Sequence, residues 1–348
     1  MAFTTIDDPS EYFQTALWSG NDSTQSITND GNSDMQPDWV WIKRRDGSAI
    51  NHQAYDSSRG VTKNLVPNEN QAEGTRSTGL TGFNSDGFSL GAGGAENASG
   101  NTFVGWQWKA NGGSRTTFTE SGDNPGGGYQ ANTTAGFSIV DFVGTGANGT
   151  VQHGLGVAPR WYIVKNRDRS ANWQVYHEDN GNTHYIKLNT TGAKLDNHEI
   201  FNDTSPTSSV FSVGIDQSVN FNGEDHIAYV FAEVQGYSKF GGYTGNGSTD
   251  GAFVYTGFSP AWVMVKRTDS GNNWHMHDNK RVPHNSNNKT LYANLNNAEA
   301  TEDFDMLSNG FKLRESGGGY NASGGTYIYM EFAQHPFVSS KGVPTTAR

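Results

Sequence analysis

Two histidines separated by one residue are the clearest place in this sequence to look for chemistry. His275 and His277 lie in the run NWHMHD at 273–278, whose alternating pattern predicts a β-strand. Both imidazoles would then share one face of the strand, where a pair of histidines can bind a transition metal. No further ligand stands at a recognisable spacing. We therefore interpret the pair as polar groups on a strand face and predict no metal site.

Tyr176 and His177 end an equivalent run, NWQVYH at 172–177. Flat aromatic rings can stack on sugar faces, and loops rich in Asn and Asp can supply hydrogen bonds to a ligand. We expect these two residues and the histidine pair to be exposed, and they are the candidate binding residues. The alternative interpretation is that they are incidental surface aromatic residues.

Signatures of catalysis are missing from the sequence. It has no Gly-x-Ser-x-Gly elbow, no His-Glu-x-x-His helix and no phosphate-binding loop followed by Lys and Ser or Thr. The acidic run at 302–305 has no comparably acidic counterpart elsewhere, so a glycosidase pair cannot be located. With no cysteine there is no thiolate chemistry and no disulfide. We predict no catalytic residue, no cofactor and no enzymatic activity.

The strands that must position these residues recur three times. The stretch 159–168 returns at 260–269 and stands earlier at 37–46: a proline precedes an apolar run that begins with tryptophan and ends with lysine and then aspartate. This pattern predicts a buried strand followed by a turn. The second aromatic strand follows it in each copy. We expect the tryptophans of these two strands to fill the core of a sandwich, and they are Trp39, Trp161, Trp262, Trp173 and Trp274.

The other predicted strands keep the same order in each copy, which indicates tandem modules of about 100 residues. The spacing is longer between the first and second copies, so we expect the second and third modules to form a rigid pair with the first set apart. The predicted boundaries are an N-terminal arm at 1–10, modules at 11–110, 135–235 and 236–337, a Gly-rich linker or surface excursion at 111–134, and a C-terminal tail at 338–348.

Composition agrees with an all-β chain of three tandem β-sandwich modules, jelly-roll or lectin-like. Of the 348 residues, 44 are glycine and 12% are aromatic, as expected for short strands joined by tight turns. The net charge of -11 makes nucleic acid an unlikely partner. No apolar stretch is long enough to insert in a membrane, and the N-terminus has no export signal.

Four stretches resemble repeat modules of tailed-bacteriophage virion proteins, especially tail-fibre-like proteins of marine phages and cyanophages. They are AGFSIV at 135–140, HGLGVAP at 153–159, IVKNRD at 163–168 and YSKFGGYTGNG at 237–247. The resemblance covers most of the chain and carries no catalytic motif. It implies a virion component, assembled in the host cytoplasm, that contacts other tail or capsid proteins.

From this resemblance we expect a non-enzymatic structural protein of the tail-fibre or adhesin type, which presents loops to the host surface and has a host glycan as a further candidate partner. The alternatives are a capsid decoration or tail-scaffold protein and, less favoured, a polysaccharide-degrading tailspike. Small cores and symmetric virion positions also favour a homo-oligomer.

Overall fold

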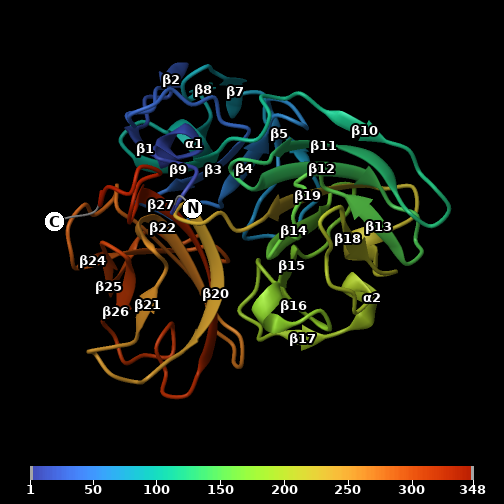
Figure 1. The fold of residues 1–348 in the computed structure, drawn as a ribbon. Coiled ribbons are helices and arrows are strands. Elements are labelled where there is room, and N and C mark those ends of the chain that lie inside the picture. Colours follow the sequence, from blue (N-terminus) through green and yellow to red (C-terminus); the bar gives the residue numbers. More distant parts are fainter. Residues whose placement is uncertain (1–2, 346–348) are drawn as a thin grey trace.

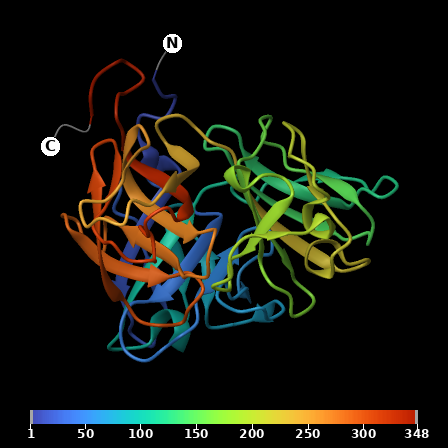
Figure 2. The same ribbon diagram turned by 90° about the horizontal axis from the view of Figure 1, so that it is seen from below.

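The computed structural model describes residues 3–345 and confirms the all-β class. Its strands fall into three groups that follow one another along the chain and lie around a common centre (Figures 1 and 2). Each group has four inner strands next to that centre and further strands outside them; the inner strands of the first group form a separate sheet, and those of the second and third groups belong to eight-stranded sheets. We call these groups the first, second and third modules.

The three inner sheets have the same strand order: the opening strand, the closing strand, the tryptophan strand and the second aromatic strand. All neighbours are antiparallel. The strands are β1 (Phe13–Ser19), β9 (Thr102–Trp108), β3 (Trp39–Arg44) and β4 (Gln53–Asp56); β12 (Phe137–Val143), β19 (Asp225–Phe231), β14 (Trp161–Asn166) and β15 (Gln174–His177); β20 (Ser238–Thr244), β27 (Thr326–Pro336), β22 (Phe258–Arg267) and β23 (Trp274–Asp278).

The outer strands are short and differ more between the modules. They are β2 (Gln25–Ile27), β5 (Lys63–Asn64), β6 (Gly74–Thr75), β7 (Leu80–Phe83) and β8 (Phe88–Leu90) in the first module; β13 (Gly149–Gln152), β16 (His184–Lys187), β17 (Leu195–Asp196) and β18 (Val210–Val213) in the second; β21 (Phe253–Tyr255), β24 (Asn287–Tyr292), β25 (Ala300–Leu307) and β26 (Gly310–Leu313) in the third.

Helices are confined to single turns between strands. They are η1 (Pro9–Glu11), α1 (Gly94–Asn97), η2 (Glu178–Asn180), α2 (His198–Phe201) and α3 (Gln217–Asn220). Two turn glycines are required by close backbone contact: a Cβ at Gly87 would lie 1.9 Å from the carbonyl oxygen of Ile27, and one at Gly310 would lie 2.0 Å from that of Val254. Both glycines have positive φ and stand where the chain turns into an outer strand.

Residues 111–134 are an ordered excursion of the second module. They form β10 (Thr116–Phe118) and β11 (Gly126–Asn132), and β11 pairs along its whole length with β12. The segment was predicted as a linker or an excursion, and the structure selects the excursion. It extends the second module's sheet at its first edge, where the other two inner sheets end with β1 and β20.

Alternation along the inner strands produces two separate apolar layers. In β14, Trp161 and Ile163 face the centre, whereas Tyr162 and Val164 face the module's own outer strands. The same division holds in β3 and β22, so each module has an outer core of its own. The central cluster contains side chains from all three modules, and we call it the hub.

The hub is built mainly from aromatic rings that cross module boundaries. All five tryptophans predicted for the core are buried, but they lie in the hub, between modules, and not inside the sandwiches as expected. Ring centroids between modules lie 4.3 Å apart for Trp39 and Tyr229, 5.6 Å for Trp108 and Trp262, and 5.8 Å for Phe231 and Phe332.

The expectation that the first module stands apart is therefore wrong. Its inner sheet contributes as fully to the hub as the other two, because the hub-facing side of β3 and β9 is apolar and must be covered. The longer spacing in the sequence reflects the β10–β11 excursion and does not separate the modules.

The two ends of the chain meet beside the third module. Ile6 of the N-terminal arm is buried in the hub, and Thr4 packs close to Gly236. Asp7 accepts hydrogen bonds from the backbone N–H and the hydroxyl of Ser340 in the C-terminal tail, with donor–acceptor distances of 2.6 and 2.5 Å. Residues 1–2 and 346–348 of the predicted arm and tail lie outside the described residues.

Removing a hub ring should destabilise the whole chain. We expect Trp108→Ala to lower the free energy of unfolding by about 3–5 kcal/mol, the usual effect of truncating a buried aromatic ring, and to leave a single unfolding transition because the hub is shared. Chemical denaturation followed by tryptophan fluorescence and circular dichroism measures both. Leu17→Ala, at an exposed position of the neighbouring strand β1, is the control. Separate unfolding of the first module would contradict a shared hub.

Candidate functional site

The four predicted binding residues are not at the surface. Tyr176 is 2% exposed, His275 is 1% exposed, and His177 and His277 are fully buried. The prediction of exposure was wrong because β15 and β23 are covered on both faces, by the hub on one side and by the module's outer core on the other. A sequence with period two cannot distinguish a half-buried strand from one covered twice when its polar positions are His, Gln and Tyr.

Tyr176 and His177 also point in opposite directions. Tyr176 stacks on Tyr162 in the outer core of the second module, with centroids 4.6 Å apart. His177 packs edge-on against Trp161 at the hub, and its Nε2–H donates to the carbonyl oxygen of Tyr329, 3.4 Å away in the third module. Burial lowers the pKa of His177 to about 3. It is therefore a neutral structural residue.

The histidine pair belongs to the outer core of the third module. His275 Nδ1 lies 2.6 Å from Oε2 of Glu302. The other carboxylate oxygen, Oε1, accepts a hydrogen bond of 3.0 Å from the hydroxyl of Tyr292. His277 stacks on Phe304 with centroids 4.4 Å apart, and burial lowers its pKa well below the usual value. Within residues 3–345, no group of three or more histidines and carboxylates is placed to hold a metal ion.

Equivalent hydrogen bonds define how the modules correspond. The backbone N–H that opens each second aromatic strand donates to an asparagine side chain: His52 to Asn68 at 2.8 Å, Trp173 to Asn189 at 3.1 Å, and Trp274 to Asn294 at 2.9 Å. Counting from these anchors, Gln53, Gln174 and His275 occupy the same position in the three modules.

The same residues also join the modules in a ring. Trp173 Nε1 donates to the carbonyl oxygens of Val66 and Glu69 in the first module, both at 3.1 Å, and Trp274 Nε1 donates to Lys187 of the second module at 3.0 Å. The third contact is made by His52, whose Nε2–H donates to the carbonyl oxygens of Tyr292 and Leu295 at 3.1 and 3.0 Å. We call these three boundaries the 1–2, 2–3 and 3–1 seams.

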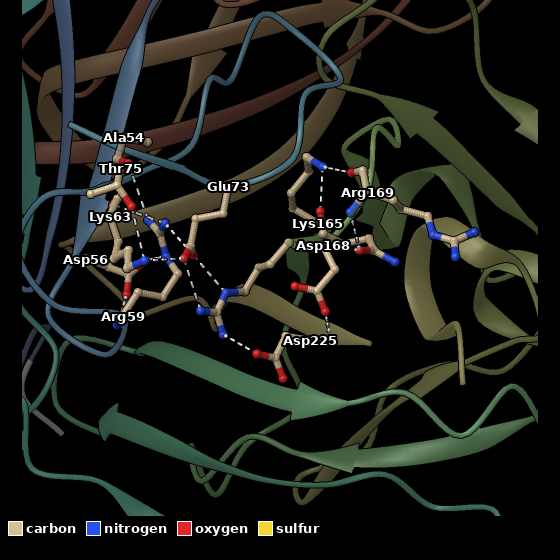
Figure 3. A network of polar contacts seen from close by, with 12 residues as sticks. Ala54, Asp56, Arg59, Lys63, Glu73, Thr75, Lys165, Asp168, Arg169 and Asp225 are labelled. Atoms are coloured by element: carbon tan, nitrogen blue, oxygen red, sulfur yellow. Dashed lines mark hydrogen bonds and ion pairs between the residues drawn. The ribbon is translucent and has the colours of Figure 1, made fainter. Parts of the chain in front are cut away.

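A buried ion-pair network runs across the 1–2 seam (Figure 3). Arg59 and Asp56 are both fully buried and lie 2.5 Å apart. Arg59 also contacts Glu73 at 3.2 Å, and Glu73 bridges to Arg167 of the second module at 2.9 Å. Burial acts to raise the pKa of Glu73, but Arg167 and Arg59 outweigh it and hold the pKa below its usual value.

The 3–1 seam repeats this network, and the 2–3 seam lacks it. Asp278 and Arg281 form a buried pair at 2.5 Å, Arg281 contacts Glu299, and Glu299 bridges to Arg45 of the first module at 2.7 Å. In the second module His177 and Asn180 replace the aspartate and arginine, and at the 2–3 seam Lys194 and Thr268 replace the bridging pair. These residues were not predicted from the sequence, although the Asp-x-x-Arg spacing at 56–59 and 278–281 is visible there.

The lysine near the end of each tryptophan strand is buried, and two of the three donate a hydrogen bond across a seam. Lys43 Nζ donates to the carbonyl oxygen of Asn296 at 3.2 Å, Lys266 Nζ donates to Thr191 at 3.1 Å, and Lys165 Nζ donates to Arg169 of its own module at 3.2 Å. Burial lowers the pKa of Lys43 and Lys266 to about 7 and that of Lys165 to about 8.

The second module contains an open cleft of about 450 Å³ between its inner sheet and its outer loops. Gln174 lies at its base, and its walls come from the loop after β14, from β16, from α2 and from the start of α3. The residues that line it include Tyr185, Lys187, Glu199, Ile215, Asp216 and Ser218.

The outer core near the equivalent position is built from different residues in the other modules. In the first, Glu96 accepts hydrogen bonds from Tyr55 at 2.6 Å and from Arg76 at 2.8 Å. In the third, Tyr320 fills the position of Glu96 and lies beside the pair of His275 and Glu302. The second module has Val219 there, which is shorter than either. We take the cleft as the candidate functional site because Gln174 lines it, whereas the equivalent residues Gln53 and His275 are held by Asn64 and Glu302.

Comparison with known proteins adds a family but no activity. A family model described as "Domain of unknown function (DUF7483)" matches residues 8–336. No curated protein and no solved structure matches the chain. Within the described residues, no helix has the length and apolar character needed to cross a membrane.

The buried ion pair should behave as a coupled unit. Arg59→Asn leaves the carboxylate of Asp56 buried without its partner, and we expect it to cost about 3–5 kcal/mol of unfolding free energy. Adding Asp56→His, which copies the second module, should recover part of that loss. Chemical denaturation of both single variants and the double variant measures the coupling. Lys280→Ala, which removes an exposed ion pair with Asp30, should change stability by less than about 1 kcal/mol. Additive effects of the two buried substitutions would contradict the coupling.

The seam lysines should make stability depend on pH. The pKa of Lys266 is about 7 in the folded chain and 10.5 ordinarily, because burial and the neighbouring Arg267 outweigh Asp269. Between those values the folded state binds fewer protons than the unfolded state, so the contribution of Lys266 to stability rises with pH across this window. We expect Lys266→Met to be more stable than wild type at pH 7, and this advantage to shrink by about 1 kcal/mol per pH unit towards pH 9.

Denaturation at pH 7, 8 and 9 tests this expectation, with exposed Lys341→Met as the matched loss of a lysine. An advantage of Lys266→Met that stays constant from pH 7 to pH 9 would show that the amine does not change its protonation in this range.

Proposed function

The chain belongs to this family of unknown function, and from the resemblance of its sequence to phage virion modules, together with its architecture, we propose that it is a non-enzymatic structural protein of the phage virion, of the tail-fibre or adhesin type, that attaches to a host surface. The observation that carries the proposal is that the three modules bury their inner faces against one another and direct their outer strands and loops outwards. The hub covers one face of every inner sheet, so we place partner contacts at the outer strands, their loops and the cleft of the second module.

A closed hub suits such a role for a physical reason. The modules are joined through aromatic packing and through hydrogen bonds at all three seams, so their loops are held at fixed positions relative to one another. Binding surfaces that are already ordered lose less conformational entropy when they engage a ligand. Several copies of the protein on one particle would add avidity, and the proposal includes such repeated copies.

A capsid decoration or tail-scaffold role is the second candidate, and one surface feature favours it. Phe253 and Tyr255 of the edge strand β21 are 46% and 55% exposed. By strand register the position of Phe253 is held by Thr150 in the second module and by Ser26 in the first. Exposed aromatic side chains at a place where the other copies are polar suit contact with a neighbouring virion protein.

Adsorption experiments test the attachment proposal. We expect fluorescently labelled protein to bind saturably to cells of a susceptible bacterial host and to compete with phage particles for them. Resistant host strains that lack surface polysaccharide are the control. Failure of the folded protein to bind cells that the phage infects would contradict attachment.

Two further measurements separate the alternatives. Density for the chain in the interior of the capsid or tail, away from any host-facing surface, would support the scaffold role. Release of reducing sugar from host polysaccharide would instead indicate a tailspike.

A further inference from the structure

We propose that the cleft of the second module is a ligand-binding site for an uncharged saccharide, of about one or two sugar units. This inference rests on the proposed attachment function and specifies its ligand class. It is carried by a buried polar group that lacks a partner, by the comparison of the three modules, and by the charge balance of the cleft walls.

The base of the cleft holds an unused hydrogen-bond acceptor. Gln174 is 3% exposed, and its Nε2 donates to the hydroxyl oxygen of Ser218 at 2.7 Å. Its Oε1 has no hydrogen-bond partner among the described residues, although the side chain lines the cleft. Leaving a buried amide oxygen unpaired costs about 1–3 kcal/mol. Oε1 itself is buried, so the proposal includes a turn of the Gln174 side chain toward the cleft, where a ligand hydroxyl would donate to this oxygen and remove that cost.

The equivalent residues in the other modules are closed off from ligands. Gln53 Oε1 accepts a hydrogen bond of 2.9 Å from Asn64. His275 is held by Glu302 through Nδ1; its Nε2 also has no partner among the described residues, but the backbone of Gly319 covers it, where a Cβ would come within 2.9 Å. The position of Gln174 is thus closed in the first and third modules and opens into a cleft in the second. A purely structural requirement for a polar residue here would not explain the cleft.

The cleft walls carry balanced charge. Lys187 and Arg169 stand opposite Glu199 and Asp216 in the lining, so its formal charge is zero. Two of these groups already have internal partners: Arg169 donates to Glu224 at 2.6 Å, and Asp216 accepts the backbone N–H of Ser218 at 2.8 Å. A phosphate or sulfate ligand would need unpaired cations, which the lining does not concentrate.

The remaining surface of the cleft suits a sugar ring. Ile215, which is 46% exposed, gives apolar surface for the C–H face of a pyranose beside the accessible edge of Tyr185, and Gln174, Ser218 and the carboxylates give hydrogen-bonding groups for its hydroxyls. The volume of about 450 Å³ lies in the range of small-molecule sites. Neutral saccharide is therefore the ligand class that uses both parts of the lining.

The central experiment measures binding of neutral and acidic sugars to the full chain. Titration calorimetry and NMR would use lactose, maltose, cellobiose and chitobiose as neutral probes and sialyllactose as the acidic one. We expect wild type to bind at least one neutral probe better than sialyllactose. Gln174→Leu should weaken that binding about tenfold, the effect of about 1.4 kcal/mol. No neutral binding at millimolar sugar, or preference for the acidic probe, would overturn the proposal.

Two variants keep the outcome interpretable. Gln53→Leu makes the same change in the first module and should leave sugar affinity unchanged. Ile215→Trp, at an exposed position of the cleft mouth, narrows the cleft without touching Gln174 and should also weaken binding. Unfolding curves establish that each variant is folded. Equal affinity of wild type, Gln174→Leu and Ile215→Trp would place binding elsewhere and overturn the cleft assignment.

The same variants separate this inference from the attachment function. If wild type and Gln174→Leu adsorb equally to host cells, attachment stands and the cleft proposal fails. If the neutral sugar binds wild type and not Gln174→Leu, but neither protein adsorbs to cells, the cleft proposal stands and attachment fails.

Discussion

Mutual burial of three apolar sheet faces is the constraint on which the rest of the structure depends. Each inner sheet is apolar on both sides: its outer strands cover one side, and nothing within the module covers the other. An isolated module would expose a row of tryptophan and phenylalanine side chains to water, which is unfavourable in proportion to their area. Placing three such faces against one another removes that exposure. The three modules of one chain therefore bury the same surface that three separate subunits would bury by associating.

The seams show how polar groups are accommodated beside that hub. Backbone carbonyls at the ends of the outer strands accept hydrogen bonds from Trp173, Trp274 and His52, and buried lysines satisfy further carbonyls. The buried Asp–Arg–Glu–Arg network crosses the 1–2 and 3–1 seams, whereas the second and third modules are joined by the more exposed pair of Lys239 and Glu233. A buried charge is tolerated where its partner and its hydrogen bonds are all present. In the second module both members of the buried Asp–Arg pair are replaced, by His177 and Asn180, so no buried charge stands there without a partner.

The hub and the outer cores respond differently to sequence change. Hub positions of the tryptophan strand and of the closing strand must fit neighbouring modules and hold aromatic or large apolar residues in every module. The outer cores face loops of variable length, and the position of Gln174, which opens into the cleft, is occupied in the first module by Gln53 bonded to Asn64 and in the third by His275 bonded to Glu302. Sequence differences between the modules are therefore concentrated in the outer cores and their loops. There they do not disturb the hub, and they can create binding sites.

The sequence by itself determined the local features: the all-β class, the repeated order of strands, the strand–turn pattern at Trp39, Trp161 and Trp262, and the burial of those residues. Period, turn residues and repetition act over short stretches and can be read along the chain. Only the tertiary structure decided which side of each strand meets which partner. It placed the tryptophans in a hub between modules, buried Tyr176, His177, His275 and His277, joined the first module to the others, and opened a cleft above Gln174. These outcomes depend on contacts between residues that are more than 100 positions apart, such as Trp39 with Tyr229, and alternation alone does not specify what covers either face of a strand.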